Sequence, residues 1–151
     1  LMKVLSLFDG ISCGMLALQR AGIPVECYDA FEIDKYAVTV SKRNFPVIVH
    51  HGNVYDGDFT QFKGYDLLLG GSPCTYWSIA KKDREIDCNG EGFRLFQEYV
   101  RALEESGCQY FLYENNYSVH QNIKDEITRV LGVGPIMINS ALVSAQTEKC
   151  A

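Results

Sequence analysis

The chain has 151 residues, of which 47% are hydrophobic and 22% are charged. This length and composition predict one globular domain with an adequate core, over residues 1–151, and exclude a disordered or collagen-like chain. The net charge of −5 excludes a domain held on DNA or on an anionic membrane by its overall charge alone.

The sequence shows no segment that would place the chain in a membrane or outside the cell. Its apolar runs are short, as at Leu67–Leu69, and its first eight residues are typical of a strand rather than a signal peptide. We therefore expect a cytoplasmic protein with reduced thiols. The six cysteines and three histidines fall in no metal-ligand spacing, so we also expect no metal site.

Strand-like and helix-like patterns alternate in the first half of the chain. Apolar stretches predict buried strands at 4–8, 25–31 and, in a shorter form, 46–50. The helices predicted between them run from the glycine turn at 10–14 to about Ala21, and from an N-cap at Asp34 to about Asn44.

The second half continues the alternation after a polar loop at 81–91. Strands are predicted at 65–69, 109–113, 135–138 and 141–144. One helical face is formed by Leu95, Phe96, Tyr99, Val100 and Leu103. A second helix is predicted to begin with a capping box formed by Ser118 and Gln121 and to end at Gly132.

This alternation predicts an α/β fold, a Rossmann-like parallel sheet with helices on both faces. Ligands of such sheets bind at the carboxyl ends of the strands. The polar motifs of the chain all follow predicted strands, and they are Asp9–Gly10, Glu32, Asn53, Pro73–Cys74 and Glu114–Asn115. We therefore expect an active site at this edge of the sheet.

The first turn and the end of the second strand are typical of a nucleoside site. Glycines in the Phe8–Gly14 turn let the backbone approach a ligand, and a carboxylate at Glu32 can bind both hydroxyls of a ribose. The spacing is GxxxG rather than GxGxxG, which favours a cofactor without phosphates. The alternative is any doubly wound domain with a tight first turn.

Asn53 follows the third predicted strand and precedes an apolar residue, Val54. Its side chain can reach an adenine edge while Val54 packs on the ring, but a simple turn asparagine after a glycine explains the pattern equally well.

The strongest local signal is the segment Gly70–Cys74. Its two glycines clear space at the end of a strand, and Pro73 stiffens the backbone that presents Cys74. A thiol in such a loop can act as a nucleophile, so Cys74 is the candidate, whereas we interpret the other five cysteines as structural.

Together these segments resemble the DNA cytosine-5 methyltransferase family in order and spacing. The resemblance covers nearly the whole chain. It lies in Phe8–Gly14, Phe31–Asp34, Gly70–Cys74, Glu91–Phe96 with Glu98–Tyr99, and Phe111–Asn116. It implies S-adenosylmethionine as cofactor, double-stranded DNA as substrate, and DNA methylation of the kind found in restriction–modification.

The resemblance also assigns roles to residues. The implied catalytic residues are Cys74, Glu114, Asn115 and Pro73. The implied cofactor-binding residues are Phe8, Asp9, Gly10, Ile11, Ser12, Cys13, Gly14, Glu32, Ile33, Asn53, Val54, Gly71 and Leu95. In this chemistry Cys74 adds to carbon 6 of a flipped cytosine, Glu114 donates a proton at N3, and the loop 75–90 closes over the base.

The chain departs from the family pattern in three respects. Asn53 stands where the family has an aspartate, and Glu148 and Cys150 stand where arginines follow the matching Gln146. The family also continues with a target-recognition region, so we expect this chain to be a catalytic lobe with little methyl transfer on its own.

Two other functions compete with this interpretation. A non-catalytic remnant or adaptor that binds a partner methyltransferase is favoured by Glu148 and Cys150, and opposed by the intact Cys74 and Glu114. A small-molecule methyltransferase or a dinucleotide dehydrogenase would share the fold, but it leaves Pro73–Cys74 and Glu114–Asn115 unexplained.

Overall fold

The computed structural model describes residues 1–145 and 149–150. They form two compact units. The sheet unit consists of residues 1–71 and 101–113, and the loop–helix unit consists of residues 72–100 and the chain from Glu114 onward. The helix α3 (Glu91–Ser106) contributes to both, because the division falls between Val100 and Arg101. A single domain over residues 1–151 stays a prediction.

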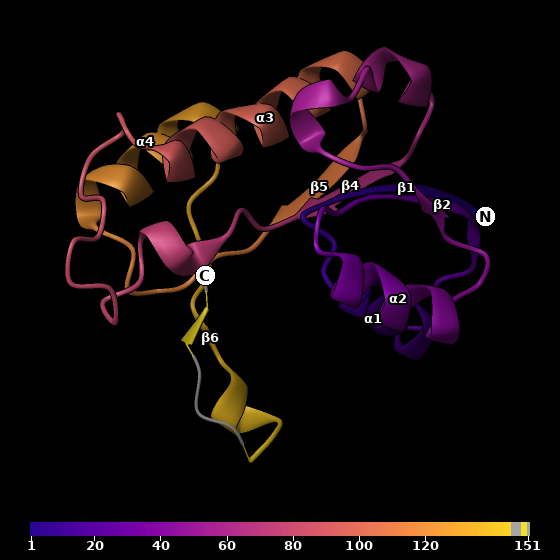
Figure 1. Ribbon diagram of the computed structural model, residues 1–151, viewed down its shortest axis with the longest axis horizontal. Coiled ribbons are helices and arrows are strands. Elements are labelled where there is room, and N and C mark those ends of the chain that lie inside the picture. The colour runs from indigo at the N-terminus through magenta and orange to yellow at the C-terminus, as the bar shows by residue number, and fades with distance from the viewer. Residues whose placement is uncertain (146–148, 151) are drawn as a thin grey trace. The chain divides into compact units, whose positions relative to one another are not determined.

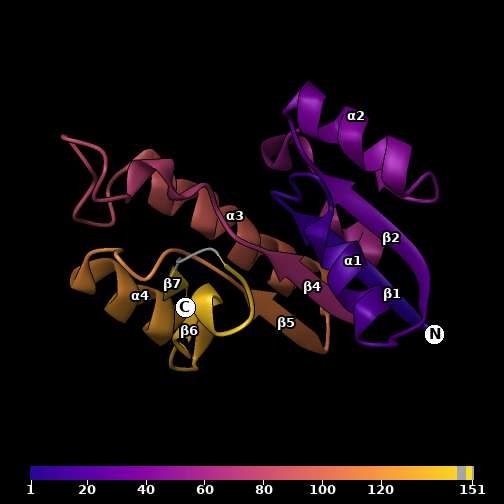
Figure 2. The same ribbon diagram turned by 90° about the horizontal axis from the view of Figure 1, so that it is seen from below.

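The sheet unit contains five parallel strands in the order β3-β2-β1-β4-β5, as Figure 2 shows for its four longer members. The strands are β1 (Met2–Leu7), β2 (Val25–Phe31), β3 (Val49–His50), β4 (Leu67–Gly70) and β5 (Tyr110–Tyr113). The strand order reverses between β1 and β4, and the carboxyl ends of strands at such a point are where open α/β sheets bind ligands.

Helices cover both faces of this sheet, which confirms the predicted fold class. The helices α1 (Cys13–Arg20) and α2 (Lys35–Asn44) lie on one face (Figure 1). The short helices η1 (Val54–Asp56) and η2 (Phe59–Phe62) lie on the other, together with residues 101–106 of α3. The described residues include no helix with the length and apolarity that a membrane span needs.

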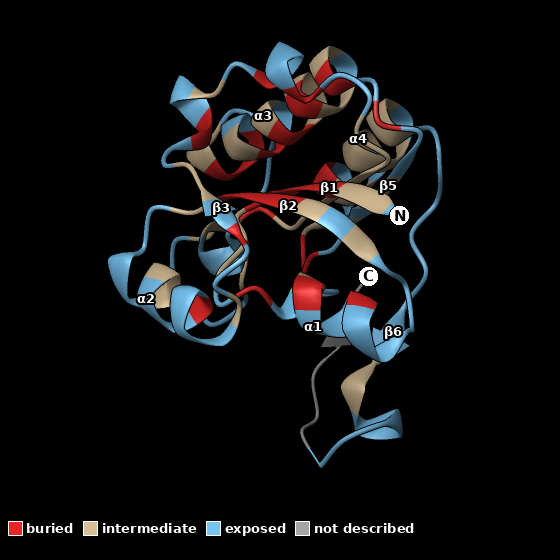
Figure 3. Cartoon of the chain, turned by 90° about the vertical axis from the view of Figure 1, so that its right-hand side faces the viewer, coloured by how far each residue is buried: buried red, intermediate tan, exposed pale blue. Residues whose placement is uncertain are grey.

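Side chains alternate between the two faces along the central strands. Val4, Tyr28 and Ala30 pack with Met15 and Leu18 of α1, and all five are buried. The central strands are largely red, the colour of buried residues, in Figure 3. Leu5, Leu7, Phe31 and Leu68 alternate with these residues and are equally buried. The near-continuous apolar runs of the sequence therefore reflect a sheet that is covered on both sides.

Most predicted elements of the sheet unit are confirmed, with one strand shorter than predicted. The side chain of Asp34 accepts from the amides of Tyr36 and Ala37, as an N-cap does. The predicted strand at 46–50 is reduced to β3, because a turn closed by the Ile48 amide on the Phe45 carbonyl (3.1 Å) occupies its first half.

The loop–helix unit contains η3 (Cys74–Tyr76), the first part of α3, α4 (Gln121–Leu131), β6 (Ile138–Asn139), η4 (Ser140–Leu142) and β7 (Lys149–Cys150). Gly132 ends α4 in a left-handed conformation, as predicted. The predicted capping box is wrong, because His120 caps the helix by accepting from the Asn122 amide.

The last two predicted strands are also corrected. Of the stretch 135–138, only Ile138 joins a strand, and β6 pairs antiparallel with β7. The stretch 141–144 is not a strand, because the Asn139 side chain accepts from the Ala141 amide (3.0 Å) and starts the turn η4. An asparagine that binds the backbone two residues later favours a turn over a strand.

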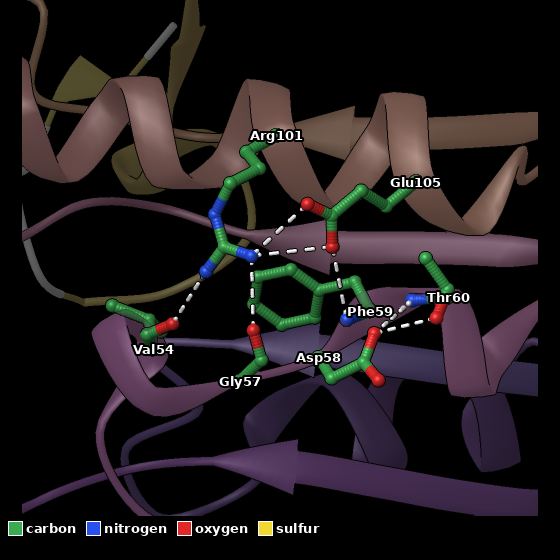
Figure 4. Close-up of polar contacts among 7 residues, drawn as sticks. All are labelled: Val54, Gly57, Asp58, Phe59, Thr60, Arg101 and Glu105. Carbon is green, nitrogen blue, oxygen red and sulfur yellow. Dashed lines mark hydrogen bonds and ion pairs between the residues drawn. The ribbon is translucent and has the colours of Figure 1, made fainter.

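One arginine joins three segments of the sheet unit (Figure 4). Arg101 donates to the carbonyls of Val54 and Gly57 (both 2.9 Å) and to the carboxylate of Glu105 (3.2 Å). Its guanidinium lies 4.5 Å from the ring centre of Phe59, whose amide donates to Glu105 (3.0 Å). Arg101 and Glu105 therefore fix the η1–η2 segment on α3.

We expect Arg101→Met to lower the free energy of unfolding by about 1–3 kcal/mol, because two carbonyls and a carboxylate lose their donor. The measurement is urea unfolding followed by circular dichroism. The matched control is Arg129→Met, since Arg129 is 69% exposed and pairs with Glu126 of its own helix. We expect the control to lose less than about 1 kcal/mol, and equal losses would contradict the assigned role.

Candidate active site

The first turn of the sheet unit has an unusual backbone. Phe8, Gly10 and Ser12 all have positive φ values, of 56°, 58° and 68°. The left-handed conformation is free for glycine but unfavourable for Phe8 and Ser12, at about 1–3 kcal/mol each. Other interactions must therefore hold this turn, which begins at the carboxyl end of β1.

The carboxylate of Asp9 holds the turn from inside. One oxygen accepts from the hydroxyls of Ser6 (2.6 Å) and Tyr28 (2.7 Å), and the other accepts from Ser12, whose hydroxyl also bonds Ser41. Burial and the charge of Asp9 raise the pKa of Tyr28 far above its usual range, so this hydroxyl remains a donor. The hydroxyls of two strand residues, of Ser12 at the N-cap of α1 and of Ser41 inside α2 thus fix the turn.

Close packing explains the last glycine of the turn. A Cβ at Gly14 would lie 2.8 Å from the hydroxyl oxygen of Tyr28 and 2.9 Å from a methyl carbon of Leu69. The spacing GxxxG therefore reflects two different needs, positive φ at Gly10 and space against the sheet at Gly14. Cys13, the residue before Gly14, is exposed.

Glu32 lies at the carboxyl end of β2 and connects it to the turn. One carboxylate oxygen accepts from the Gly10 amide and the other from the Asp34 amide, both at 2.8 Å. Ile11, which follows Gly10, is 50% exposed, and Ile33, which follows Glu32, is 74% exposed. An oriented carboxylate between two exposed apolar side chains fits a ribose and its base, so these residues fit a nucleoside cofactor.

Asn53 and Val54 follow β3 and lie at the start of η1. The side-chain oxygen of Asn53 accepts from the Tyr55 amide (3.1 Å), which is the behaviour of a turn asparagine. Val54 is only 5% exposed, while Asn53 is exposed. A contact of either residue with an adenine ring stays a prediction.

In the loop–helix unit, the candidate nucleophile lies in a short helical turn. Pro73 precedes η3 and has a φ of −52°, and the side chain of Cys74 is exposed. Ser72 is buried, and its carbonyl accepts from the side-chain amide of Asn115 (3.0 Å), which also lies 3.4 Å from the Ser72 hydroxyl. The structure therefore brings the proline–cysteine and glutamate–asparagine segments together, as expected.

The glutamate–asparagine segment is rigid around its asparagine. The side-chain oxygen of Asn115 accepts from the Asn116 amide (2.8 Å), and Asn116 accepts from the Ser118 amide (2.8 Å). Asn115 is buried and Glu114 is exposed. Asn115 thus fixes the position of this segment against Ser72, while the neighbouring Glu114 carboxylate is exposed.

The remaining predicted residues have less specific surroundings. Gly71 ends the first part of the sheet unit, and Leu95 lies half-buried on α3. Gln146 and Glu148 lie outside the described residues, and Cys150 is described only by its backbone in β7. No group of metal-ligating side chains occurs within the part of the chain that the structure describes.

Two residues of the predicted polar loop make specific contacts that the sequence did not predict. Arg84 donates to the Ser118 carbonyl (2.9 Å), and Glu85 accepts from the amides of Glu91 and Gly92. The sequence predicted only a polar loop at 81–91, and these two side chains attach it to the rest of the unit. The only signal was a glutamate six residues before a helix start.

Comparison with known proteins gives one family. The family model described as C-5 cytosine-specific DNA methylase matches residues 2–131. The chain is 37% identical over 117 residues to the orphan methyltransferase M.SPRI of Bacillus phage SPR, covering 76% of this chain and 26% of that protein. It is 33% identical over 116 residues to the type II methyltransferase M.HgiCII of Herpetosiphon aurantiacus, covering 75% and 25%. The chain thus spans about a quarter of these relatives' length.

Two solved structures resemble the chain over 99% of its length. One is the Dnmt2 methyltransferase of S. pombe, with a TM-score of 0.72 and 18% sequence identity, and the match covers 49% of that chain. The other is a DNMT2 variant of Spodoptera frugiperda, with a TM-score of 0.74, 20% identity and the same coverage. At these identities the likeness establishes the Rossmann-like methyltransferase fold.

We expect Asn115→Asp to lower the free energy of unfolding by about 1–3 kcal/mol, because a buried carboxylate oxygen would replace the donor that faces the Ser72 carbonyl. Hydrogen exchange of residues 72–76 should also become faster. Urea unfolding and exchange mass spectrometry measure the two effects. Asn122→Asp, at the exposed start of α4, is the control and should change stability by less than about 0.5 kcal/mol. Unchanged exchange at 72–76 would contradict the positioning role of Asn115.

Proposed function

Because the chain belongs to the C-5 cytosine-specific DNA methylase family, we propose that it is the cofactor-binding and catalytic lobe of a DNA cytosine-5 methyltransferase. The observation that supports this most is the hydrogen bond from Asn115 to the Ser72 carbonyl. It holds an exposed thiol at Cys74 and an exposed carboxylate at Glu114 on segments that are fixed to each other. A methyltransferase of another class would not need this pair.

We propose that S-adenosylmethionine, which supplies the methyl group when bound, is held at the carboxyl ends of β1 and β2. Glu32 would accept from the ribose hydroxyls, and Ile11 and Ile33 would cover the apolar faces of the nucleoside. The turn that Asp9 holds would present its backbone to the rest of the cofactor. Asn53 and Val54 would contribute at the adenine.

The thiolate of Cys74 would activate the substrate ring. Carbon 5 of cytosine is a poor nucleophile, and addition of the thiolate to carbon 6 moves an electron pair through the ring to carbon 5 and N3. Glu114 would donate a proton to N3, which neutralises the negative charge of the ring. Carbon 5 would then take the methyl group, with S-adenosylhomocysteine as the leaving group. A base would remove the proton from carbon 5, the bond to carbon 6 would break to release the Cys74 thiolate, and N3 would return its proton to Glu114.

The substrate would be a cytosine turned out of double-stranded DNA, because carbon 6 cannot be reached inside the base stack. The segment 75–90, which starts beside the thiol, would cover that base. We propose the cytoplasm as its location and DNA methylation of the restriction–modification kind as its role, since one relative is named a type II methyltransferase.

The test is covalent capture of Cys74. An oligonucleotide with 5-fluorocytosine opposite an abasic site offers a base that flips at low cost, and fluorine at carbon 5 blocks the final elimination. With S-adenosylmethionine present, we expect mass spectrometry of the intact protein to show one adduct with the oligonucleotide, and peptide mapping to place it at Cys74.

Two variants decide the interpretation of the capture experiment. Cys74→Ser should give no adduct, whereas Cys88→Ser, at a half-buried cysteine of the same unit, should give the wild-type yield. Absence of an adduct in wild-type protein that binds S-adenosylhomocysteine would contradict a catalytic lobe and favour the adaptor. An adduct that persists in Cys74→Ser would show that Cys74 is not the nucleophile.

A further inference from the structure

The amino end of α3 is covered by a carboxylate from the preceding loop. The oxygens of Glu85 accept from the amide of Glu91 at 3.0 Å and from the amide of Gly92 at 3.1 Å. The backbone of Glu85 is itself held, since its amide donates to the Tyr76 carbonyl (2.9 Å). Helix amino ends carry free amides and a partial positive charge, so this position suits an anion.

Two glycines make room for that anion. A Cβ at Gly90 would lie 2.1–2.4 Å from the three carboxyl atoms of Glu85, and a Cβ at Gly92 would lie 2.9 Å from one carboxylate oxygen. These separations are far below ordinary contact, so any other residue at either position would expel the carboxylate. The chain thus forms a cradle for an anionic group at the start of α3.

A buried donor without a partner lies in the same cradle. Trp77 is fully buried, and its indole N–H has no hydrogen-bond partner among the residues that the structure describes. The indole nitrogen lies 2.6 Å from the Cβ position of Gly92, which places it next to the helix amide that Glu85 accepts from. Unpaired buried donors are rare and unfavourable, so a third donor here calls for a further acceptor.

We propose that the amino end of α3 is a binding site for a phosphate group, and that Glu85 occupies it until a phosphate displaces the carboxylate. Each of the two charged oxygens of a phosphodiester can accept more than one hydrogen bond, and their tetrahedral arrangement differs from that of a flat carboxylate, so the group can serve the amides of Glu91 and Gly92 and the Trp77 indole. The proposal relies on the proposed function for the source of the phosphate, which is the DNA backbone.

The charges near the cradle are compatible with this exchange. The Glu91 carboxylate, which would repel a phosphate, lies 3.4 Å from the Arg94 guanidinium. Lys81 and Lys82 are exposed on the loop that carries Glu85, and Arg84 precedes it. Since this loop begins directly after Cys74, displacement of the Glu85 carboxylate by a DNA phosphate would remove one of the loop's attachments only when DNA is present, while the bond from Arg84 to Ser118 remains.

The experiment uses the fluorescence of Trp77, which is the one tryptophan of the sequence. The chain is compared with Glu85→Ala and with Asp83→Ala, which removes an exposed carboxylate from the same loop. Each is titrated with inorganic phosphate against potassium chloride of equal ionic strength. We expect Glu85→Ala to show a saturable fluorescence change and a rise in melting temperature with millimolar phosphate, whereas Asp83→Ala shows neither.

A short DNA duplex distinguishes DNA from free phosphate as the ligand. Because Glu85→Ala lacks the carboxylate that competes with phosphate, it should bind the duplex about threefold or more tightly than Asp83→Ala at the same salt concentration. A phosphate response without tighter DNA binding would overturn the assignment to DNA. No phosphate response in Glu85→Ala would overturn the site and leave Glu85 as a helix cap.

Separate controls show whether each variant folds and whether its result depends on the proposed function. Circular dichroism checks each variant, and Glu85→Gln, which removes the charge but keeps one acceptor oxygen, replaces Glu85→Ala if that variant does not fold. The phosphate titration requires neither methyl transfer nor S-adenosylmethionine. Its failure is therefore distinguishable from failure of covalent capture at Cys74.

Discussion

The hydrogen bonds to the Asp9 carboxylate are the constraint on which the cofactor end of this fold depends. They hold two non-glycine residues, Phe8 and Ser12, in the left-handed conformation. Three hydroxyl donors to one carboxylate contribute enough to offset that strain, since bonds to a charged acceptor are the stronger ones. The turn is therefore held by hydrogen bonds within the chain, and Glu32 accepts from its Gly10 amide from the end of the next strand.

Side-chain hydrogen bonds also fix the loops of the loop–helix unit, through one amide and one carboxylate. Asn115 donates to the Ser72 carbonyl, and Glu85 accepts from the first amides of α3. In both cases a side chain bonds the backbone of a distant segment, so an irregular loop is fixed without regular secondary structure. Cys74, the proposed nucleophile, lies between these two attachments in the chain, which restrains its loop while its thiol stays exposed.

Local signals predicted most regular elements, local turn and cap hydrogen bonds overturned some of them, and the residues that were missed altogether have partners on other elements. The strand 25–31 and the Asp34 cap follow from neighbouring residues alone, and both are confirmed. His120 displaced the predicted cap at Ser118, because Asn116 binds the Ser118 amide. The partners of Asp9 and Glu85 lie on other elements, and no periodicity reveals them. The sequence thus showed which segments matter, but not that Asp9 and Asn115 position them.

The central claim is that the carboxyl ends of β1 and β2 form a cofactor site in the chain as it stands. The most direct measurement is a titration of ¹⁵N-labelled protein with S-adenosylhomocysteine, followed by amide NMR spectra. We expect saturable shifts concentrated at Gly10, Ile11, Ile33 and Asp34, with the amides of α4 unchanged. Absence of shifts at these four amides, or shifts confined to other segments, would contradict this claim.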